Sequence, residues 1–242
     1  MPSFEAWGNT DPGNVRKNNE DAWLIDPALS LAVVADGMGG AACGEVASAI
    51  TAETIAEHLR EKNGENKDAQ TLIAEAIGLA NKRVLEKARE SADCKGMGST
   101  VVIALLRHPN IFISNVGDSR AYLFRNGVIT QLSYDQTLLN ELCSTTPMTA
   151  EEIERFPHKH VLTMAVGTTE RIKVQNYQGE VEVGDQILLC SDGLSGPVPD
   201  SDIRDILKES IPVEAKVDKL IALAKERGGP DNVTVVLVHC LP

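Results

Sequence analysis

Positive charge is scarce in this chain of 242 residues, which has 23 lysine and arginine residues against 35 aspartate and glutamate residues. The formal net charge at pH 7 is -12. Broad nucleic-acid binding and attachment to an anionic membrane surface both depend on clustered lysine and arginine side chains. We therefore expect neither a nucleic acid nor a membrane surface to be a partner.

Long apolar runs are absent as well. No stretch approaches the ~20 residues that cross a bilayer, and residues 1–7 lack the basic and then apolar order of a signal peptide. The sequence therefore predicts no membrane anchor and a cytoplasmic location. With 43% hydrophobic residues and no low-complexity tract, it also predicts one compact domain over residues 1–242, which we expect to be monomeric.

The cysteines are few and irregularly spaced. They are Cys43, Cys94, Cys143, Cys190 and Cys240, an odd number with no Cys-x-x-Cys pair. This pattern disfavours a disulfide framework and a zinc ribbon, so we expect reduced thiols that serve mostly in packing. A cysteine-dependent phosphatase needs an arginine six positions after its nucleophile. No cysteine here has one, which excludes that chemistry.

Three aspartates stand beside apolar, strand-like runs. They are Asp36, after the run 31–35, Asp192, after the run 187–190, and Asp231, before the run 232–238. A single Asp-Gly pair is more often a turn than a ligand. Three carboxylates at the ends of buried strands instead indicate a shared site for a hard metal such as magnesium or manganese, whose preferred ligands are oxygen atoms.

Six motifs, in order, carry a resemblance to a known family. They read GNVRKNNEDA, VVADGMGG, GMGSTVV, NVGDSRAY, LLCSDGLSG and GGPDNVTVV. Together they resemble the motifs of the metal-dependent serine/threonine protein phosphatases of type 2C across nearly the whole chain. Met38, where eukaryotic relatives usually carry histidine, and the element Gly117-Asp118-Ser119 both resemble the bacterial branch of that family.

The arrangement of strands and helices predicts an α+β layered domain. Apolar spacing predicts helices over residues 45–62, from about 72 to 88, over 202–210 and over 213–227. We expect residues 101–132 to form an antiparallel meander whose last two strands join at Asn126-Gly127, a two-residue hairpin signal. The resemblance sharpens the fold class to a four-layer α-β-β-α sandwich, with two central antiparallel β-sheets flanked by α-helices.

The resemblance also implies a set of metal ligands for two to three divalent ions, Mn2+ or Mg2+. Asp36 would bridge two ions, and Asp192 and Asp231 would complete the first site. The carbonyl of Gly37, with waters, would help to hold the second. Asp118 would share a third, weaker ion with Asp192. The residues alone leave another interpretation of Asp118 open, a tight turn.

Three further residues have catalytic roles by resemblance: Arg16, Glu20 and Asp21. Glu20 and Asp21 would act mainly through metal-bound waters. The guanidinium of Arg16 could hold two phosphoryl oxygens, although a lone arginine in an Asn-rich loop is more often a solvated surface group. A hydroxide bridging two ions would attack phosphorus in line. Because Met38 cannot donate a proton, we expect a metal-bound water to protonate the leaving group.

Residues 133–168 resemble the flap subdomain that borders the cleft in bacterial relatives. Gln136 replaces the usual histidine and Met164 stands where an arginine is common, so we expect a shifted peptide preference with activity retained. His158 and His160 either touch substrate or stay solvated. We favour the solvated interpretation, because the segment is polar and has no ligand spacing tied to the carboxylates.

The function that these features favour is a phosphatase acting on phosphoserine and phosphothreonine in proteins. Its partners would be phosphorylated proteins, including a bacterial Ser/Thr kinase that it opposes or the substrates of that kinase. One alternative is a catalytically silent binding module, which is disfavoured because Asp36, Asp192 and Asp231 are all present with Arg16. The other is a small-molecule phosphomonoesterase, which only a panel of substrates distinguishes.

Overall fold

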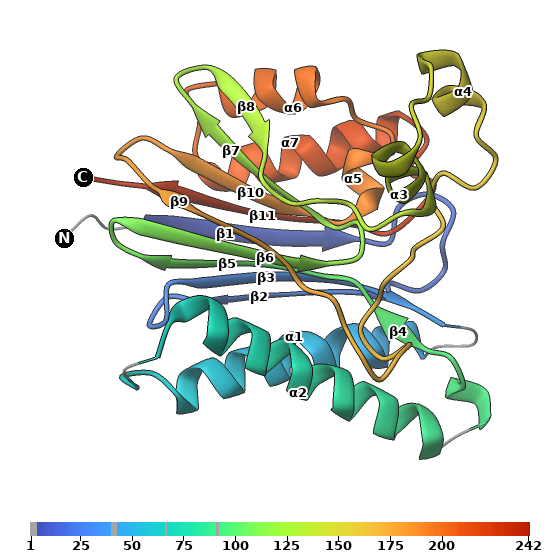
Figure 1. Ribbon diagram of the computed structural model, residues 1–242. Coiled ribbons are helices and arrows are strands. Elements are labelled where there is room, and N and C mark those ends of the chain that lie inside the picture. Colours follow the sequence, from blue (N-terminus) through green and yellow to red (C-terminus); the bar gives the residue numbers. More distant parts are fainter. Residues whose placement is uncertain (1–3, 40–42, 66, 91) are drawn as a thin grey trace.

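Two β-sheets packed face to face form the centre of the molecule, and helices cover both outer faces (Figure 1). The computed structural model describes residues 4–39, 43–65, 67–90 and 92–242. Gly40 of the DGMGG motif and residues 1–3 of the N-terminal segment lie outside the described residues. The four-layer α-β-β-α sandwich that the sequence predicts is confirmed.

The strands are β1 (Phe4–Asp11), β2 (Asp21–Asp26), β3 (Leu31–Met38), β4 (Gly98–Ser99), β5 (Val101–Arg107), β6 (Asn110–Val116), β7 (Arg120–Arg125), β8 (Val128–Gln131), β9 (Gln175–Glu180), β10 (Gln186–Cys190) and β11 (Val233–Cys240). The α-helices are α1 (Gly44–Glu61), α2 (Ala69–Glu90), α3 (Leu138–Thr145), α4 (Ala150–Arg155), α5 (Asp192–Ser195), α6 (Asp200–Leu207) and α7 (Val213–Glu226), and η1 (Ala92–Cys94) is a 3-10 helix.

Neighbouring strands run antiparallel in both sheets. The first sheet has the order β1-β11-β10-β7-β8, and the second has the order β2-β3-β5-β6-β9 with β4 paired to β3. Helices α1 and α2 cover the outer face of the second sheet, and α6 and α7 cover the outer face of the first (Figure 1). Central strands such as β3, β5, β10 and β11 are therefore buried on both faces along most of their length.

The alternation of side chains along β3 shows how the layers are held together. Leu31 and Val33 belong to the apolar cluster shared with α1 and α2. Ala32 and Val34 point the opposite way and join the cluster between the two sheets. Successive side chains on a strand point to opposite faces. A strand buried on both faces is therefore apolar throughout, as the run in the sequence indicated.

The expectation of one meander over residues 101–132 is wrong. Strands β5 and β6 pair in one sheet, whereas β7 and β8 pair in the other. The chain crosses between the sheets at residues 117–119, where Gly117 has a φ of 94°. A backbone in this region favours glycine, because other side chains clash there. The crossing carries Asp118 to the end of the sandwich.

Helices α1, α2, α6 and α7 were predicted within a few residues of their observed ends, whereas α3, α4 and α5 were not predicted. Helices α4 and α5 have 6 and 4 residues, too few to establish a helical period, and α3 has no buried residue that would mark an apolar face. The predicted hairpin is present at Asn126 and Gly127, whose φ angles are 52° and 80°. No helix among the described residues is long and apolar enough to cross a membrane.

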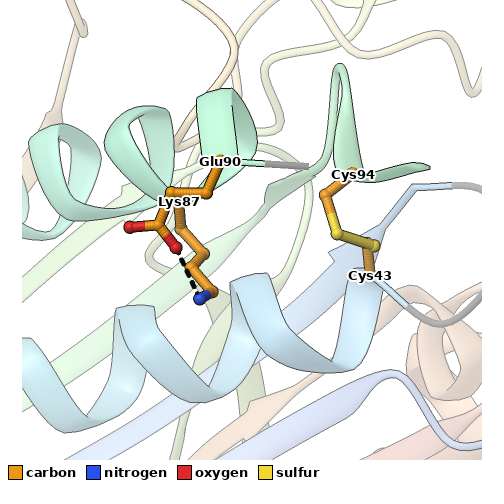
Figure 2. The surroundings of a disulfide bond; sticks show 4 residues. All are labelled: Cys43, Lys87, Glu90 and Cys94. Atoms are coloured by element: carbon orange, nitrogen blue, oxygen red, sulfur yellow. Dashed lines mark hydrogen bonds and ion pairs between the residues drawn. A yellow bond between two sulfur atoms is a disulfide. The ribbon is translucent and has the colours of Figure 1, made fainter. Parts of the chain in front are cut away.

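The expectation that all cysteines are reduced is also wrong. Cys43 and Cys94 form a disulfide that joins the N-terminal end of α1 to η1 (Figure 2). The cysteine count and the missing Cys-x-x-Cys spacing gave no sign of it, because the two residues are 51 positions apart and meet only when the helices pack. Cys190 and Cys240 are free and buried, and Cys143 is free and exposed.

Candidate active site

A cleft of about 510 Å³ lies where carboxylate side chains from both sheets meet. Asp36 and Gly37 come from the end of β3 in the second sheet. Asp192 begins α5 two residues after the end of β10, and Asp231 lies two residues before β11, so strands of the first sheet position both. Of the predicted site residues, those that line the cleft are Arg16, Glu20, Asp36, Gly37, Asp118, Asp192 and Asp231.

The backbone of Asp36 is fixed by the strand beside it. Its N–H donates to the hydroxyl of Thr100 at 3.1 Å, and its carbonyl accepts from the N–H of Thr100 at 2.8 Å. The hydroxyl of Ser99 donates to the same carbonyl at 3.1 Å. Gly37 is equally confined, because an added Cβ there would lie 2.0 Å from the carbonyl oxygen of Gly44. Only glycine fits this position.

Asp21 is the one predicted site residue that does not line the cleft. It pairs with Asp36 across β2 and β3, and its carboxyl is buried behind the cleft wall. Its Oδ2 accepts hydrogen bonds from Ser191 at 2.8 Å and Thr234 at 2.6 Å. Its Oδ1 is buried without a partner in the described residues. An unpaired buried carboxylate oxygen is costly, and such an atom fits a place beside a bound cation or its waters.

Asn232 joins the segment that carries Arg16 and Glu20 to the loop of Asp231. Its side-chain oxygen accepts from the N–H of Glu20 at 2.8 Å, and its amide donates to the carbonyl of Asn18 at 2.9 Å. Arg16 itself forms an ion pair with Asp231, with 2.7 Å between Nη2 and Oδ2. Sequence reasoning did not single out Asn232, because an asparagine beside a strand is most simply a turn residue.

The cleft concentrates negative charge in a partly enclosed space. Burial, followed by the neighbouring aspartates, raises the pKa of Asp36 well above its ordinary value. Burial is also the largest cause that raises the pKa of Asp192, and the charge of Asp231 adds to it. The pKa values of Asp21 and Asp118 rise to about 7, again chiefly through burial. Such a cluster is stabilised when a cation binds among the carboxylates.

The residues of the cleft fit a divalent metal. Several carboxylates with raised pKa values face one space. Outside the lining of the cleft, Asp21, which pairs with Asp36, has a buried carboxylate oxygen without a partner in the described residues. Within the described part of the chain, no three His, Cys, Asp or Glu side chains already stand in a metal-binding arrangement. The ion pair with Arg16 engages Oδ2 of Asp231, so Arg16 and a metal would compete for this carboxylate.

The charge cluster predicts how stability depends on pH without metal. Asp21 and Asp118 keep protons up to pH about 7 in the folded protein, whereas an unfolded aspartate releases its proton near 3.8. The folded state therefore binds more protons between these values, and the free energy of unfolding falls as pH rises through them. A loss of ~2 kcal/mol would lower Tm by roughly 4–8 °C.

Thermal melts in EDTA between about pH 5 and pH 8 check this prediction. Saturating Mn2+ should flatten the trend, because the carboxylates then bind the ion. Asp118→Asn should reduce the slope in EDTA, since one titrating group is removed. A Tm in EDTA that stays constant or rises over this range would contradict the assignment of protons to the folded state.

His160 is exposed to solvent, as the sequence favoured, and it also lies in the wall of the cleft. Its side chain is exposed, and it borders both the cleft and an adjoining pocket of about 240 Å³. An isolated bridge between Thr137 and Leu162 closes the segment and places His160 there. His158 is exposed and lines neither space. No sequence signal separated the two histidines, because only the fold of the segment decides which one faces the cleft.

The two unusual flap residues have structural partners. Gln136 is buried, and its side-chain oxygen accepts from the N–H of Gly117 at 2.9 Å while its amide donates to the carbonyl of Lys173 at 2.8 Å. It therefore supports the crossing that carries Asp118. Met164 packs against the apolar cluster of α1 and α2 and lines neither the cleft nor the adjoining pocket.

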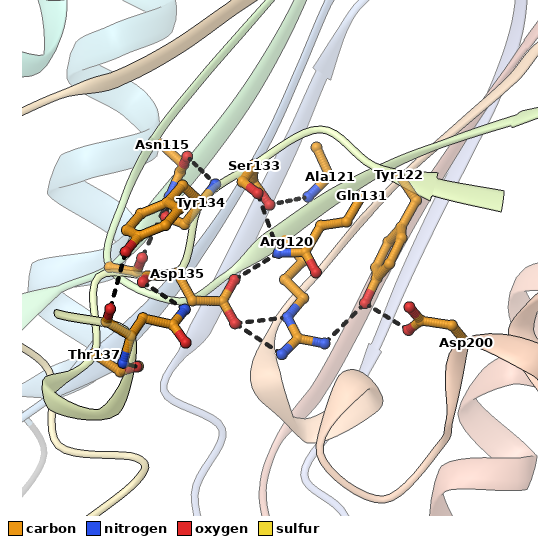
Figure 3. A network of polar contacts seen from close by, with 12 residues as sticks. Asn115, Arg120, Ala121, Tyr122, Gln131, Ser133, Tyr134, Asp135, Thr137 and Asp200 are labelled. Atoms are coloured by element: carbon orange, nitrogen blue, oxygen red, sulfur yellow. Dashed lines mark hydrogen bonds and ion pairs between the residues drawn. The ribbon is translucent and has the colours of Figure 1, made fainter. Parts of the chain in front are cut away.

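A polar network anchors the start of the flap to β7 (Figure 3). Arg120 forms an ion pair with Asp135 at 2.7 Å and donates to the hydroxyl of Tyr122 at 3.0 Å. Tyr122 in turn donates to Asp200 at the start of α6 at 3.1 Å. The network therefore ties the flap, β7 and the outer helical layer together, which holds this wall of the adjoining pocket in place.

A carboxylate-lined cleft at one end of an α-β-β-α sandwich defines a metal-dependent hydrolase of the type 2C phosphatase fold. The chain belongs to the protein phosphatase 2C family, whose sequence profile matches residues 14–234. The resemblance drawn from the six motifs is therefore confirmed. The protein is a metal-dependent serine/threonine protein phosphatase of the bacterial branch.

Two relatives are similar in sequence to nearly the whole of this chain. Serine/threonine phosphatase Stp of Listeria innocua is 35% identical over 235 residues, which are 95% of this chain and 93% of the relative. PstP of Mycobacterium tuberculosis is 37% identical over 229 residues, which cover 94% of this chain and 43% of that protein.

The structural similarity extends over the whole chain. The crystal structure of M. tuberculosis PstP/Ppp has a TM-score of 0.91 at 33% identity and covers 100% of both chains. A PstP catalytic domain in complex with two manganese ions has a TM-score of 0.88 at 34% identity, again over 100% of both chains.

Proposed function

We propose that Asp36, Asp192 and Asp231 hold two divalent ions, with the carbonyl of Gly37 as a further ligand. The observation that carries this proposal is the single cleft in which these residues meet. Oxygen donors of this kind suit Mn2+ and Mg2+. The two manganese ions bound by the related PstP domain support the number of ions.

We also assign a third, weaker ion to Asp118 and Asp192. Both residues border the cleft and the adjoining pocket, so a cation between them would lie where the two spaces meet. Burial and the charge of Asp192 raise the pKa of Asp118, and a bound cation would relieve this repulsion.

The chain's own residues position the phosphate and the water molecules around the ions. Bound divalent ions would lower the pKa of a coordinated water and neutralise phosphoryl oxygens. Arg16 would leave Asp231 and hold two oxygens of the phosphate, a task that suits its planar guanidinium. Glu20 in the cleft wall and the unpaired Oδ1 of Asp21 would accept hydrogen bonds from waters, and so orient them.

We assign residues 1–242 to one catalytic domain, in which residues 133–168 form a flap beside the cleft. His160 and Leu162 support this role because both line the cleft. The substrates would be phosphoserine and phosphothreonine proteins, among them a bacterial Ser/Thr kinase or the proteins that it phosphorylates. A monomer is sufficient for this function, since the proposed site residues all come from one chain.

Metal-dependent release of phosphate from a phosphothreonine peptide tests the proposal. We expect no turnover in EDTA and recovery with Mn2+ or Mg2+. A panel with phosphoserine, phosphotyrosine and small phosphomonoesters would then separate a protein phosphatase from a small-molecule phosphomonoesterase. Lack of turnover with every metal would instead favour the catalytically silent binding module.

Replacing Arg16 with alanine should lower kcat/KM for the peptide by about a hundredfold, because one bidentate contact to the phosphoryl group is lost. Affinity for Mn2+ should stay the same or increase, since Asp231 loses a competing partner. Lys17→Ala, an exposed neighbour, is the matched control. A loss of equal size in both variants would show that Arg16 acts only through the general charge of its loop.

A further inference from the structure

The disulfide lies next to the segment that is proposed to bind metal. Cys43 is the residue that precedes α1, and only 5% of it is exposed. It follows the end of β3, which carries Asp36 and Gly37, by five positions. Cys94 ends η1, which leads into β4 (Figure 2). Both halves of the bond are therefore close in sequence to the same wall of the cleft.

The Cys43 half contacts this wall through Gly44. A Cβ added to Gly37 would lie 2.0 Å from the carbonyl oxygen of Gly44, and one added to Gly44 would lie 2.4 Å from Oε2 of Glu20. The backbone beside Cys43 is thus packed against a proposed metal ligand and a proposed water ligand. A displacement of Cys43 cannot leave these two residues unchanged, because close-packed groups transmit small shifts.

The Cys94 half reaches the same wall through β4. The carbonyl of Cys94 accepts from the N–H of Met97 at 3.0 Å. The next two residues, Gly98 and Ser99, pair with Met38 and Gly37. The hydroxyl of Ser99 then donates to the carbonyl of Asp36 at 3.1 Å. The bond therefore joins the two segments that confine Asp36 and Gly37 from opposite sides.

We propose that Cys43 and Cys94 are an oxidation-sensitive pair whose state sets the affinity of the metal site, an inference that rests on the proposed metal ligands. Oxidation fastens the two confining segments and pre-organises Asp36 and Gly37 for the ion. Reduction releases the two segments from each other. Metal binding must then order this wall of the cleft, and the affinity for the metal is lower. A ligand binds more tightly when the segments that hold it are already ordered, because less conformational entropy is lost on binding. A covalent link between two such segments therefore raises the affinity.

The redox step has a defined co-reactant, a small-molecule disulfide such as oxidised glutathione. The thiols of Cys43 and Cys94 together lose two electrons and two protons and form one S–S bond. The small-molecule disulfide gains them and becomes two thiols. The other buried thiols are poor competitors, because burial raises the pKa of Cys190 to about 12 and that of Cys240 to about 11.

Thermodynamic linkage supplies a test that needs no enzyme activity. If oxidation strengthens Mn2+ binding by a given factor, Mn2+ must oppose reduction of the disulfide by the same factor. We expect at least about a fivefold coupling, near the lower end of the usual range between linked sites. In glutathione buffers this corresponds to a shift of about 20 mV for the two-electron couple.

The experiment measures free thiols by alkylation and mass spectrometry across glutathione buffers, with Mn2+ and with EDTA. Calorimetry of Mn2+ binding to the oxidised protein, the reduced protein and Cys94→Ser gives the affinities directly. We expect the reduced protein and Cys94→Ser to bind at least about fivefold more weakly, whereas Cys143→Ser matches the parent.

Three results would overturn the inference. They are equal Mn2+ affinities in both redox states, a redox midpoint that does not respond to Mn2+, and a disulfide that opens only on unfolding. If Cys94→Ser does not fold, the comparison of oxidised and reduced parent still decides the question. Lack of phosphatase activity would count against the proposed function but not against this coupling, because neither readout uses turnover.

Discussion

Asp36→Asn should lower kcat/KM on a phosphothreonine peptide by about a thousandfold or more while it raises the stability of the metal-free protein. The carboxylate of Asp36 lies in the acidic cleft, where burial and then the charges of Asp21 and Asp192 raise its pKa. An amide removes a bridging metal ligand without changing the size of the side chain. It also removes the repulsion that the cluster imposes when no cation is bound.

The two effects are measured separately. Initial rates at saturating Mn2+ give the loss of activity, and thermal melts in EDTA at about pH 8 give the stability. A gain of ~1 kcal/mol would raise Tm by roughly 2–4 °C for a domain of this size. Asp205→Asn, which changes an exposed acid on α6 that is paired with Arg204, serves as the control and should alter neither quantity.

An active Asp36→Asn variant would remove this residue from the proposed ligand set. An inactive variant with a lower Tm in EDTA would instead contradict the expected gain in metal-free stability. In that case the carboxyl group of Asp36 would stabilise the folded protein, and its raised pKa would not mean that the group lowers the free energy of unfolding. The combination that we expect, lost activity with increased metal-free stability, is typical of residues retained for function at the expense of stability.

The aspartates that line the cleft could be brought together from the sequence because local rules agreed with the fold. Each one stands where a run of apolar residues, buried on both faces, meets a loop. A strand of this kind must end at the edge of its sheet, and a shared edge brings its loops together. Gly37, next to Asp36, packs against the carbonyl oxygen of Gly44, so the end of β3 is closely confined.

The features that could not be predicted from the sequence depend on contacts between segments that are far apart along the chain. Strands β5 to β8 were expected in one meander, because short antiparallel runs give no sign of which sheet they join. His160 and His158 are two residues apart, yet only His160 lines the cleft. The ion pair of Arg16 with Asp231 links residues 215 positions apart. Such pairings become visible only once the layers are packed.

The disulfide belongs to the same class of long-range feature, and it leads to the second large expected effect. Cys94→Ser should lower the free energy of unfolding by about 4 kcal/mol, the loop-closure value for cysteines 51 positions apart. The bond encloses the whole of α1 and α2, so without it the unfolded chain gains freedom over this whole segment. At 2–4 °C per kcal/mol, Tm would fall by roughly 8–16 °C.

Chemical denaturation of the parent and of Cys94→Ser, both in EDTA, checks this value apart from any effect of metal. Cys43→Ser should behave like Cys94→Ser, and the double variant should be no less stable than either, because the same bond is lost in all three. Cys143→Ser is the control, since its thiol is exposed and outside the bond. A reducing agent should lower the stability of the parent to that of Cys94→Ser and leave that variant unchanged. If the parent and Cys94→Ser instead unfold at the same denaturant concentration, the two cysteines are not joined in solution, and the wall of the cleft is held by the hydrogen bonds of β4 alone.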